Sequence, residues 1–157
     1  MYDSMEEVYK FQQATAAYEC GNYEEAVRMF TEIAEHGDPY AQMNLGICYE
    51  MGHGVEQDYA EAAKWYRKAA EQGNPDAQFN LGLCLFVGRG VVQDYSEGVE
   101  WFKKSAKQGH VDAQLNLGFC YENGDGVAED RTEAMKWYRE AANNGSDFAR
   151  KALERLT

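Results

Sequence analysis

The fold is decided by the stretch AQMNLGICY at residues 41–49, which returns as AQFNLGLCL at 77–85 and as AQLNLGFCY at 113–121. Three tryptophans keep the same interval of 36 residues (101 − 65 = 137 − 101 = 36), at Trp65, Trp101 and Trp137. Repetition at a fixed period of a few tens of residues is typical of a solenoid, in which each unit buries its apolar face only against its neighbours. The sequence therefore predicts a stack of equivalent units.

Each repeat begins with the pattern of a short helix. Ala41, Leu45 and Cys48 lie at helical spacing and form one stripe. Gly46 stands inside this helix, where glycine costs about 1 kcal/mol relative to alanine. Its return at the same place in the next two repeats indicates that a neighbouring helix passes too close for a side chain.

A second helix follows a glycine loop. Gly52 and Gly54 supply loop conformations that other residues adopt only with strain. Asp58 then stands where it can cap a helix that carries Trp65 inward, and Gly73 stands where that helix should end. Each repeat is therefore predicted to be a pair of antiparallel helices.

The repeats account for the whole chain, so we predict a single repeat domain over residues 1–157. Its predicted parts are a helix start at 1–10, a shorter unit at 11–40, three full repeats at 41–76, 77–112 and 113–148, and a capping helix at 149–157.

Charge limits the kinds of partner. The formal net charge is −12, which argues against binding to nucleic acid or to an anionic membrane. Residues 1–40 hold nine acidic and two basic residues. This excess either keeps the protein soluble or attracts a basic partner. The chain has no long apolar run and begins with an acidic stretch, so we expect a cytoplasmic protein without a membrane span.

The cysteines and histidines do not form a predicted site. Cys48, Cys84 and Cys120 occupy the same slot in successive repeats. Adjacent helices pack about 8–10 Å apart, beyond the Cα separation of about 7 Å that a disulfide spans. We expect buried thiols, with no metal and no cofactor. His36, His53 and His110 are scattered, and we expect exposed loop histidines.

Together these motifs resemble the Sel-one-like repeat (SLR) family, a relative of the tetratricopeptide repeats. The resemblance covers 41–148 as three repeats, and 11–40 resembles a plain tetratricopeptide repeat. It implies an all-α fold: a right-handed α-α superhelix of antiparallel helix pairs whose first helices line a concave face. It also implies a role as a scaffold or adaptor that holds a partner protein or peptide.

If recurring residues hold the stack together, function should lie in exposed slots that differ between repeats. The second repeat departs most, with Leu85, Phe86 and Gly98 in place of tyrosine, glutamate and alanine. The predicted partner-binding residues on the concave face are Met43, Asn44, Ile47, Phe79, Asn80, Leu83, Phe86, Val87, Leu115, Asn116 and Phe119. The alternative is that neighbouring second helices cover this face. The three asparagines either bind the backbone of an extended peptide or bond within the protein, whereas we expect Gln42, Gln78 and Gln114 to be structural.

We predict a non-catalytic, monomeric protein-interaction module for a protein or peptide partner that is basic or amphipathic. One alternative is a specific inhibitor or immunity protein that blocks a toxin or an enzyme. Another comes from the resemblance, because some cysteine-rich relatives have been linked to binding or hydrolysis of β-lactams. The chain contains no Ser-x-x-Lys motif and lacks the paired cysteines of those relatives, so we expect no enzyme activity.

Overall fold

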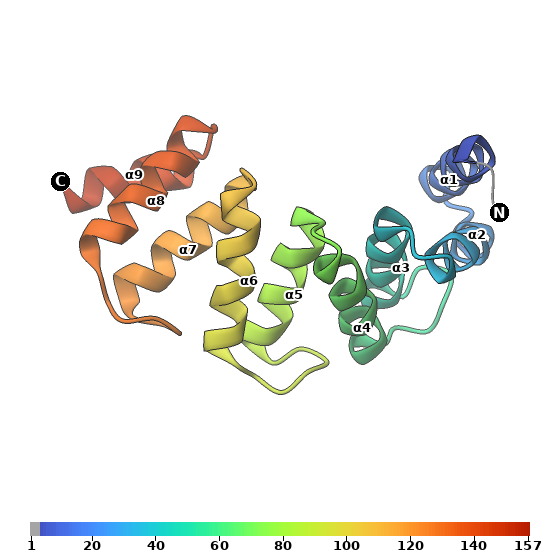
Figure 1. Ribbon diagram of the computed structural model, residues 1–157, viewed down its shortest axis with the longest axis horizontal. Coiled ribbons are helices and arrows are strands. Elements are labelled where there is room, and N and C mark those ends of the chain that lie inside the picture. The colour runs from blue at the N-terminus through green and yellow to red at the C-terminus, as the bar shows by residue number, and fades with distance from the viewer. Residues whose placement is uncertain (1–3) are drawn as a thin grey trace. The chain divides into compact units, whose positions relative to one another are not determined.

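The computed structural model describes residues 4–157, and these residues form nine α-helices and no strand (Figure 1). The predicted all-α class is confirmed. The chain divides into two compact units, of which the first ends at Asn74 and the second begins at Pro75. None of the helices in the described part is long and apolar enough to cross a lipid bilayer.

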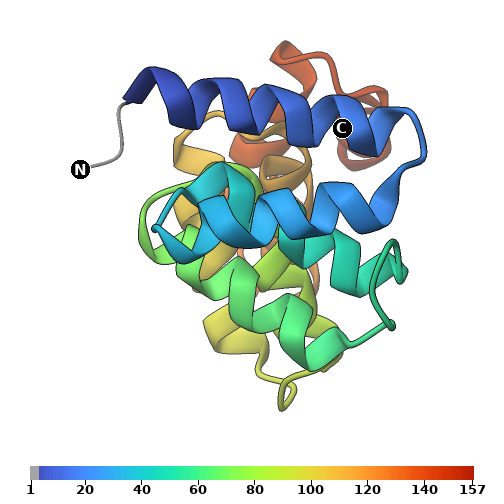
Figure 2. The same cartoon turned by 90° about the vertical axis from the view of Figure 1, so that its right-hand side faces the viewer.

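The first unit holds four helices, and each packs against the next along the chain. Figure 2 shows the blue α1 above the paler α2. Their bounds are α1 Ser4–Glu19, α2 Tyr23–Glu35, α3 Pro39–Met51 and α4 Tyr59–Glu71.

The second unit continues the same alternation with five helices, again packed in chain order. Their bounds are α5 Pro75–Val87, α6 Tyr95–Lys107, α7 Val111–Asn123, α8 Arg131–Asn143 and α9 Asp147–Leu156. We call the odd-numbered helices A helices and the even-numbered helices B helices.

The repeated slots form the core of both units. Alanine, leucine and cysteine of the AQxNLGxC stretch are at most 4% exposed in every repeat. The buried positions are Ala41, Leu45, Cys48, Ala77, Leu81, Cys84, Ala113, Leu117 and Cys120. This confirms that the stripe of each A helix is a packing stripe.

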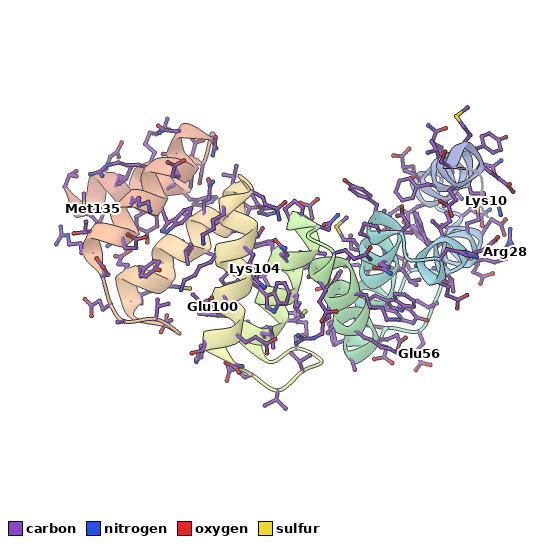
Figure 3. All side chains as sticks on the ribbon, viewed as in Figure 1. Lys10, Arg28, Glu56, Glu100, Lys104 and Met135 are labelled. Carbon is purple, nitrogen blue, oxygen red and sulfur yellow. The ribbon has the colours of Figure 1, made fainter. Side chains whose placement is uncertain are left out.

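The tryptophans of the B helices also face inward, as predicted. Trp65, Trp101 and Trp137 are 8–9% exposed. A lysine of the same helix lies over each indole, and the Nζ atom of Lys104 (labelled in Figure 3) lies 4.3 Å from the ring centroid of Trp101. The lysine side chains of the B helices therefore cover the tryptophan rings, while their ammonium groups remain in contact with water.

The predicted aspartate caps are present on the B helices of the three full repeats, α4, α6 and α8. The carboxylate of Asp58 accepts the backbone N–H of Glu61 at 3.0 Å, and Asp94 and Asp130 make the same bond in their repeats. Each bond satisfies a backbone donor that the first turn of a helix leaves unpaired.

The glycine loops of the first and third full repeats fold back over the start of the preceding B helix. Gly54 has a φ of 76°, and a side chain there would collide with the backbone carbonyl of Tyr23. Gly126 has a φ of 73°, and its Cβ would lie 2.5 Å from the carbonyl oxygen of Tyr95. Glycine is therefore required at both positions for two reasons, the positive φ angle and the close approach of the neighbouring backbone.

The glycine inside the A helix of each full repeat (α3, α5 and α7) meets an aromatic ring, which confirms the predicted close approach. A Cβ on Gly46 would lie 2.6 Å from the ring of Tyr66, and one on Gly118 would lie 2.5 Å from the ring of Tyr138. The second repeat keeps the contact with Phe102, at 2.7 Å from a Cβ on Gly82. The ring of the B helix thus rests on the bare backbone of its A helix.

We expect Gly118→Ala to lower the free energy of unfolding. Overpacking of this kind costs about 1–3 kcal/mol, which exceeds the roughly 1 kcal/mol that alanine gains over glycine in a helix. Urea denaturation followed by circular dichroism measures the change. The exposed substitution Glu140→Ala on α8 is the control and should shift the midpoint little. A higher midpoint for Gly118→Ala would contradict the close contact.

Candidate partner-binding site

The predicted site residues all keep contact with solvent. Val87 and Phe119 are 55% and 38% exposed, and the other nine are half-buried. Met43, Asn44 and Ile47 belong to the first unit, and the remaining eight belong to the second. The neighbouring B helices therefore cover this face only in part.

Some of these residues line a hollow in the second unit, between α5 and α7, with a volume of about 250 Å³. Four of the predicted residues line it, namely Leu83, Phe86, Asn116 and Phe119. Phe102 of α6 is 1% exposed and forms its floor. The sequence prediction missed Phe102 and three further lining residues, Cys120, Asn123 and Asp125. We call this hollow the apolar pocket.

Aromatic contacts fix the ring of Phe86 in the apolar pocket. Its centroid lies 4.7 Å from that of Tyr95, in an edge-on arrangement, and 5.9 Å from that of Phe102. The ring of Phe79 also packs on Phe102, with centroids 5.9 Å apart. The pocket wall is therefore held by packing on α6 before any ligand binds.

The repeats on either side fill the corresponding place with a polar pair. In the first, the Tyr66 hydroxyl donates to Oε2 of Glu50 at 2.5 Å. In the third, the Tyr138 hydroxyl donates to Oε2 of Glu122 at the same distance. In the second repeat both partners change, since Phe102 stands for the tyrosine and Phe86 for the glutamate. An apolar pair therefore replaces a polar pair in the second repeat. The repeat pattern of the sequence identified the change at Phe86 but not the change at Phe102.

The third repeat shows what the polar pair contributes. Nη1 of Arg155 lies 2.6 Å from Oε1 of Glu122. The hydrogen bond from Arg155, together with that from Tyr138, lowers the pKa of Glu122 although burial opposes this. Burial raises the pKa of Tyr138, and the hydrogen bond to the Glu122 carboxylate raises it further. The carboxylate is thus ionised and the phenol neutral at neutral pH.

Polar residues also line the apolar pocket. Asn116 and Asn123 come from α7, and Asp125 comes from the glycine loop that follows it. Within residues 4–157 no hydrogen bond is made by the side-chain amides of Asn44, Asn80 or Asn116. Their donors and acceptors are therefore not used inside the described protein.

The glutamines beside these asparagines are structural, as predicted. Gln42 is 4% exposed, and its Nε2 donates to the carbonyl of Ala34 at 3.2 Å. Its Oε1 accepts from Nε2 of Gln72 at 2.8 Å. Gln114 makes the equivalent bonds to Ala106 and Asn144 in the second unit.

The expectation of exposed loop histidines is wrong for two of the three. His53 is half-buried and stacks on Tyr23 with ring centroids 4.3 Å apart. The His110 side chain is 16% exposed: Nδ1 accepts the N–H of Ala113, and Nε2 lies 3.1 Å from Oδ1 of Asp76. Both rings have packing roles that their positions in loops did not reveal.

The cysteine prediction is confirmed for the three repeated positions, which are buried. Burial raises the pKa of Cys48 to about 11 and that of Cys120 to about 12. A thiol needs its thiolate form to act as a nucleophile, so Cys120 is unreactive near neutral pH although it lines the pocket. No group of three potential metal ligands is present among the described residues.

We expect Glu122→Gln to lower the free energy of unfolding at pH 7 by about 1–2 kcal/mol, because it weakens charge-assisted hydrogen bonds. The pKa of Glu122 is lower in the folded protein, so its stabilisation is present above the unfolded-state pKa of about 4.3 and is lost as pH falls through the folded-state value. The difference between wild type and variant should therefore shrink on acidification. Urea titrations at several pH values measure it, and a difference that grows toward low pH would contradict this role.

The comparisons with known proteins agree with this architecture. The family model of the Sel1 repeat matches residues 16–38, 39–74, 75–110 and 111–146. The first match lies in the segment that resembles a plain tetratricopeptide repeat, so this shorter unit also fits the Sel1 pattern. No curated protein matches the chain.

Solved structures give the same result. A Sel1 repeat protein from Oxalobacter formigenes is 36% identical with a TM-score of 0.87, and the match covers 90% of this chain and 58% of that protein. The protective antigen c5321 of uropathogenic Escherichia coli, which displays an SLR fold, is 36% identical with a TM-score of 0.81, over 95% of this chain and 35% of that protein. Cysteine-rich protein B of Helicobacter pylori shares the fold at 20% identity and a TM-score of 0.68, over 84% of this chain and 95% of that protein.

The chain thus spans a little over half of the first of these structures and about a third of the second. Four matched repeats, with helices that pack in chain order inside each unit, lead to one conclusion, that the chain belongs to the Sel1 repeat family.

Proposed function

We propose that the second unit binds a segment of a partner protein by inserting a bulky apolar side chain into the apolar pocket. The observation that carries this proposal is the paired change in the second repeat. Phe86 and Phe102 stand where the repeats on either side hold a hydrogen-bonded glutamate and tyrosine, and the hollow forms at that place. Sel1 repeat proteins in general mediate protein–protein interactions, which supports a partner of this class.

The size and lining of the apolar pocket suit a side chain better than a cofactor. About 250 Å³ is below the roughly 300–1,000 Å³ of small-molecule sites. Burying a leucine or phenylalanine side chain stabilises a complex by about 1.5–3 kcal/mol before entropic costs. An anchor residue in a preformed pocket is the usual source of binding energy in such interfaces.

The polar lining residues would orient the bound segment and make binding specific. The Asn116 amide can both donate to and accept from the backbone of an extended segment. The Asp125 carboxylate at the pocket edge favours a partner that carries a lysine or arginine beside its apolar anchor. The proposed ligand is therefore an extended segment with a bulky apolar residue next to a basic one.

The proposed function includes no catalysis. The thiol of the pocket has a raised pKa, and the described residues place no histidine in its lining. We expect no hydrolysis of a chromogenic cephalosporin above the rate in buffer, followed as absorbance change at micromolar protein. Turnover that persists through repeated purification would contradict the proposal.

We expect the double substitution Phe86→Glu with Phe102→Tyr to weaken binding at least tenfold while the protein stays folded. It installs the glutamate–tyrosine pair that the neighbouring repeats already tolerate, so packing is preserved while the apolar pocket becomes polar. The ligands are 12-residue peptides selected by phage display on the wild-type protein. Fluorescence anisotropy should show a dissociation constant at least tenfold higher for the double variant.

The control is Phe148→Asp on α9, which removes an apolar ring that is 73% exposed and lies outside the pocket lining. Its affinity for the same peptides should equal that of the wild type, and circular dichroism should show all three proteins folded. Selected peptides that bind the wild type and the double variant equally would reject the pocket as the site.

A further inference from the structure

The first unit contains a second hollow, larger than the apolar pocket and separate from it. It lies between the first half of α1 and the start of α3, with a volume of about 570 Å³. Its lining includes Glu7, Val8, Phe11, Gln12, Asp38 and Tyr40. None of these residues belongs to the site predicted from the repeats. We call this hollow the acidic groove.

Apolar side chains form much of its surface. Val8 and Tyr40 are 56% and 58% exposed, which is high for residues of this kind. Phe11 lies deeper and packs its ring edge-on against Phe30 of α2, with centroids 5.8 Å apart. Exposed apolar side chains gathered in one groove indicate a contact surface for another molecule.

Carboxylates flank this apolar surface, and the basic side chains of this part of the chain form ion pairs with other glutamates. Glu7 and Asp38 line the groove from α1 and from the residue before α3. The two basic residues of this part of the chain are Lys10 and Arg28 (Figure 3). Nζ of Lys10 lies 2.8 Å from Oε1 of Glu32, and the Arg28 guanidinium pairs with Glu25. The groove therefore presents net negative charge to an incoming ligand.

We propose that the acidic groove binds a basic amphipathic helix of a partner protein. The apolar stripe of that helix would lie along Val8, Phe11 and Tyr40, and lysine or arginine side chains would meet Glu7 and Asp38. A second copy of this chain fits poorly, because its net charge of −12 would be repelled from the groove. This proposal uses no residue of the apolar pocket, so it stands independently of the function proposed for the second unit.

The test uses a fluorescein-labelled 14-residue helix of leucine and lysine whose leucines form one stripe. Two peptides serve as references: the same composition in scrambled order, and the same stripe with glutamate in place of lysine. Fluorescence anisotropy is measured on the full chain in 0.15 M salt, which screens diffuse attraction. Only the striped basic peptide should bind.

Four variants locate the binding. Glu7→Lys should raise the dissociation constant at least tenfold, whereas Glu71→Lys, an equal charge change at an exposed site on α4, should not. Val8→Asp should also raise it at least tenfold although it adds a negative charge, because it removes the apolar contact. Phe86→Glu with Phe102→Tyr in the second unit should leave it unchanged. Circular dichroism confirms that each variant is folded.

Several outcomes would overturn the proposal. They are no binding of the striped basic peptide, equal binding of the scrambled peptide, equal weakening by Glu7→Lys and Glu71→Lys, and tighter binding by Val8→Asp. Loss of binding in the second-unit double variant would assign the peptide to the apolar pocket instead. A dimer in analytical ultracentrifugation that Val8→Asp dissociates would show that the groove pairs two copies of this chain.

Discussion

The contact between a glycine of the A helix and an aromatic ring of the B helix in each of the three full repeats governs the rest of the structure. Because the glycine has no side chain, the ring lies directly on the A-helix backbone, as Tyr138 does on Gly118. The residue four positions after the glycine lies on the same face of the A helix and meets the same ring. In the third repeat this residue is Glu122, which accepts the tyrosine hydroxyl, whereas in the second it is Phe86 against Phe102. One fixed contact thus defines a slot that varies between repeats, and the apolar pocket forms where that slot holds an apolar pair in place of a polar one.

Much of this arrangement could be predicted from the sequence because each feature repeats. The mid-helix glycine, the capping Asp58 and the buried Cys48 recur at one interval, and each kind of recurrence corresponds to a packing or capping role in the structure. The role of Phe102 could not be predicted from the sequence, because it is one aromatic residue in place of another on the buried face of a helix. Its meaning depends on its contact with Phe86, 16 residues earlier in the chain (102 − 86 = 16). The environment of His110 and the acidic groove depend on tertiary packing and leave no periodic signal.

The two proposed binding surfaces would obtain their binding energy from different interactions. The repeat at 77–112 holds four acidic and four basic residues, and its pocket offers mainly apolar burial, which salt screens little. The acidic groove lies in the part of the chain with the greatest acidic excess, where attraction acts over longer distances and weakens with salt. A chain of similar repeats can therefore present two kinds of recognition, because the recurring residues maintain the packing of each unit and the others are free to differ.

The most direct test of the central claim is a nuclear magnetic resonance titration of protein labelled with ¹³C in its phenylalanine rings, using a peptide selected on the wild type. The account predicts shift changes for Phe86, Phe102 and Phe119, the phenylalanines that line the apolar pocket. Phe30, buried in the first unit, and Phe148, exposed on α9, should not respond. Changes at Phe148 or in the first unit, with the three pocket rings unaffected, would contradict the claim that the altered slot of the second repeat is where a partner binds.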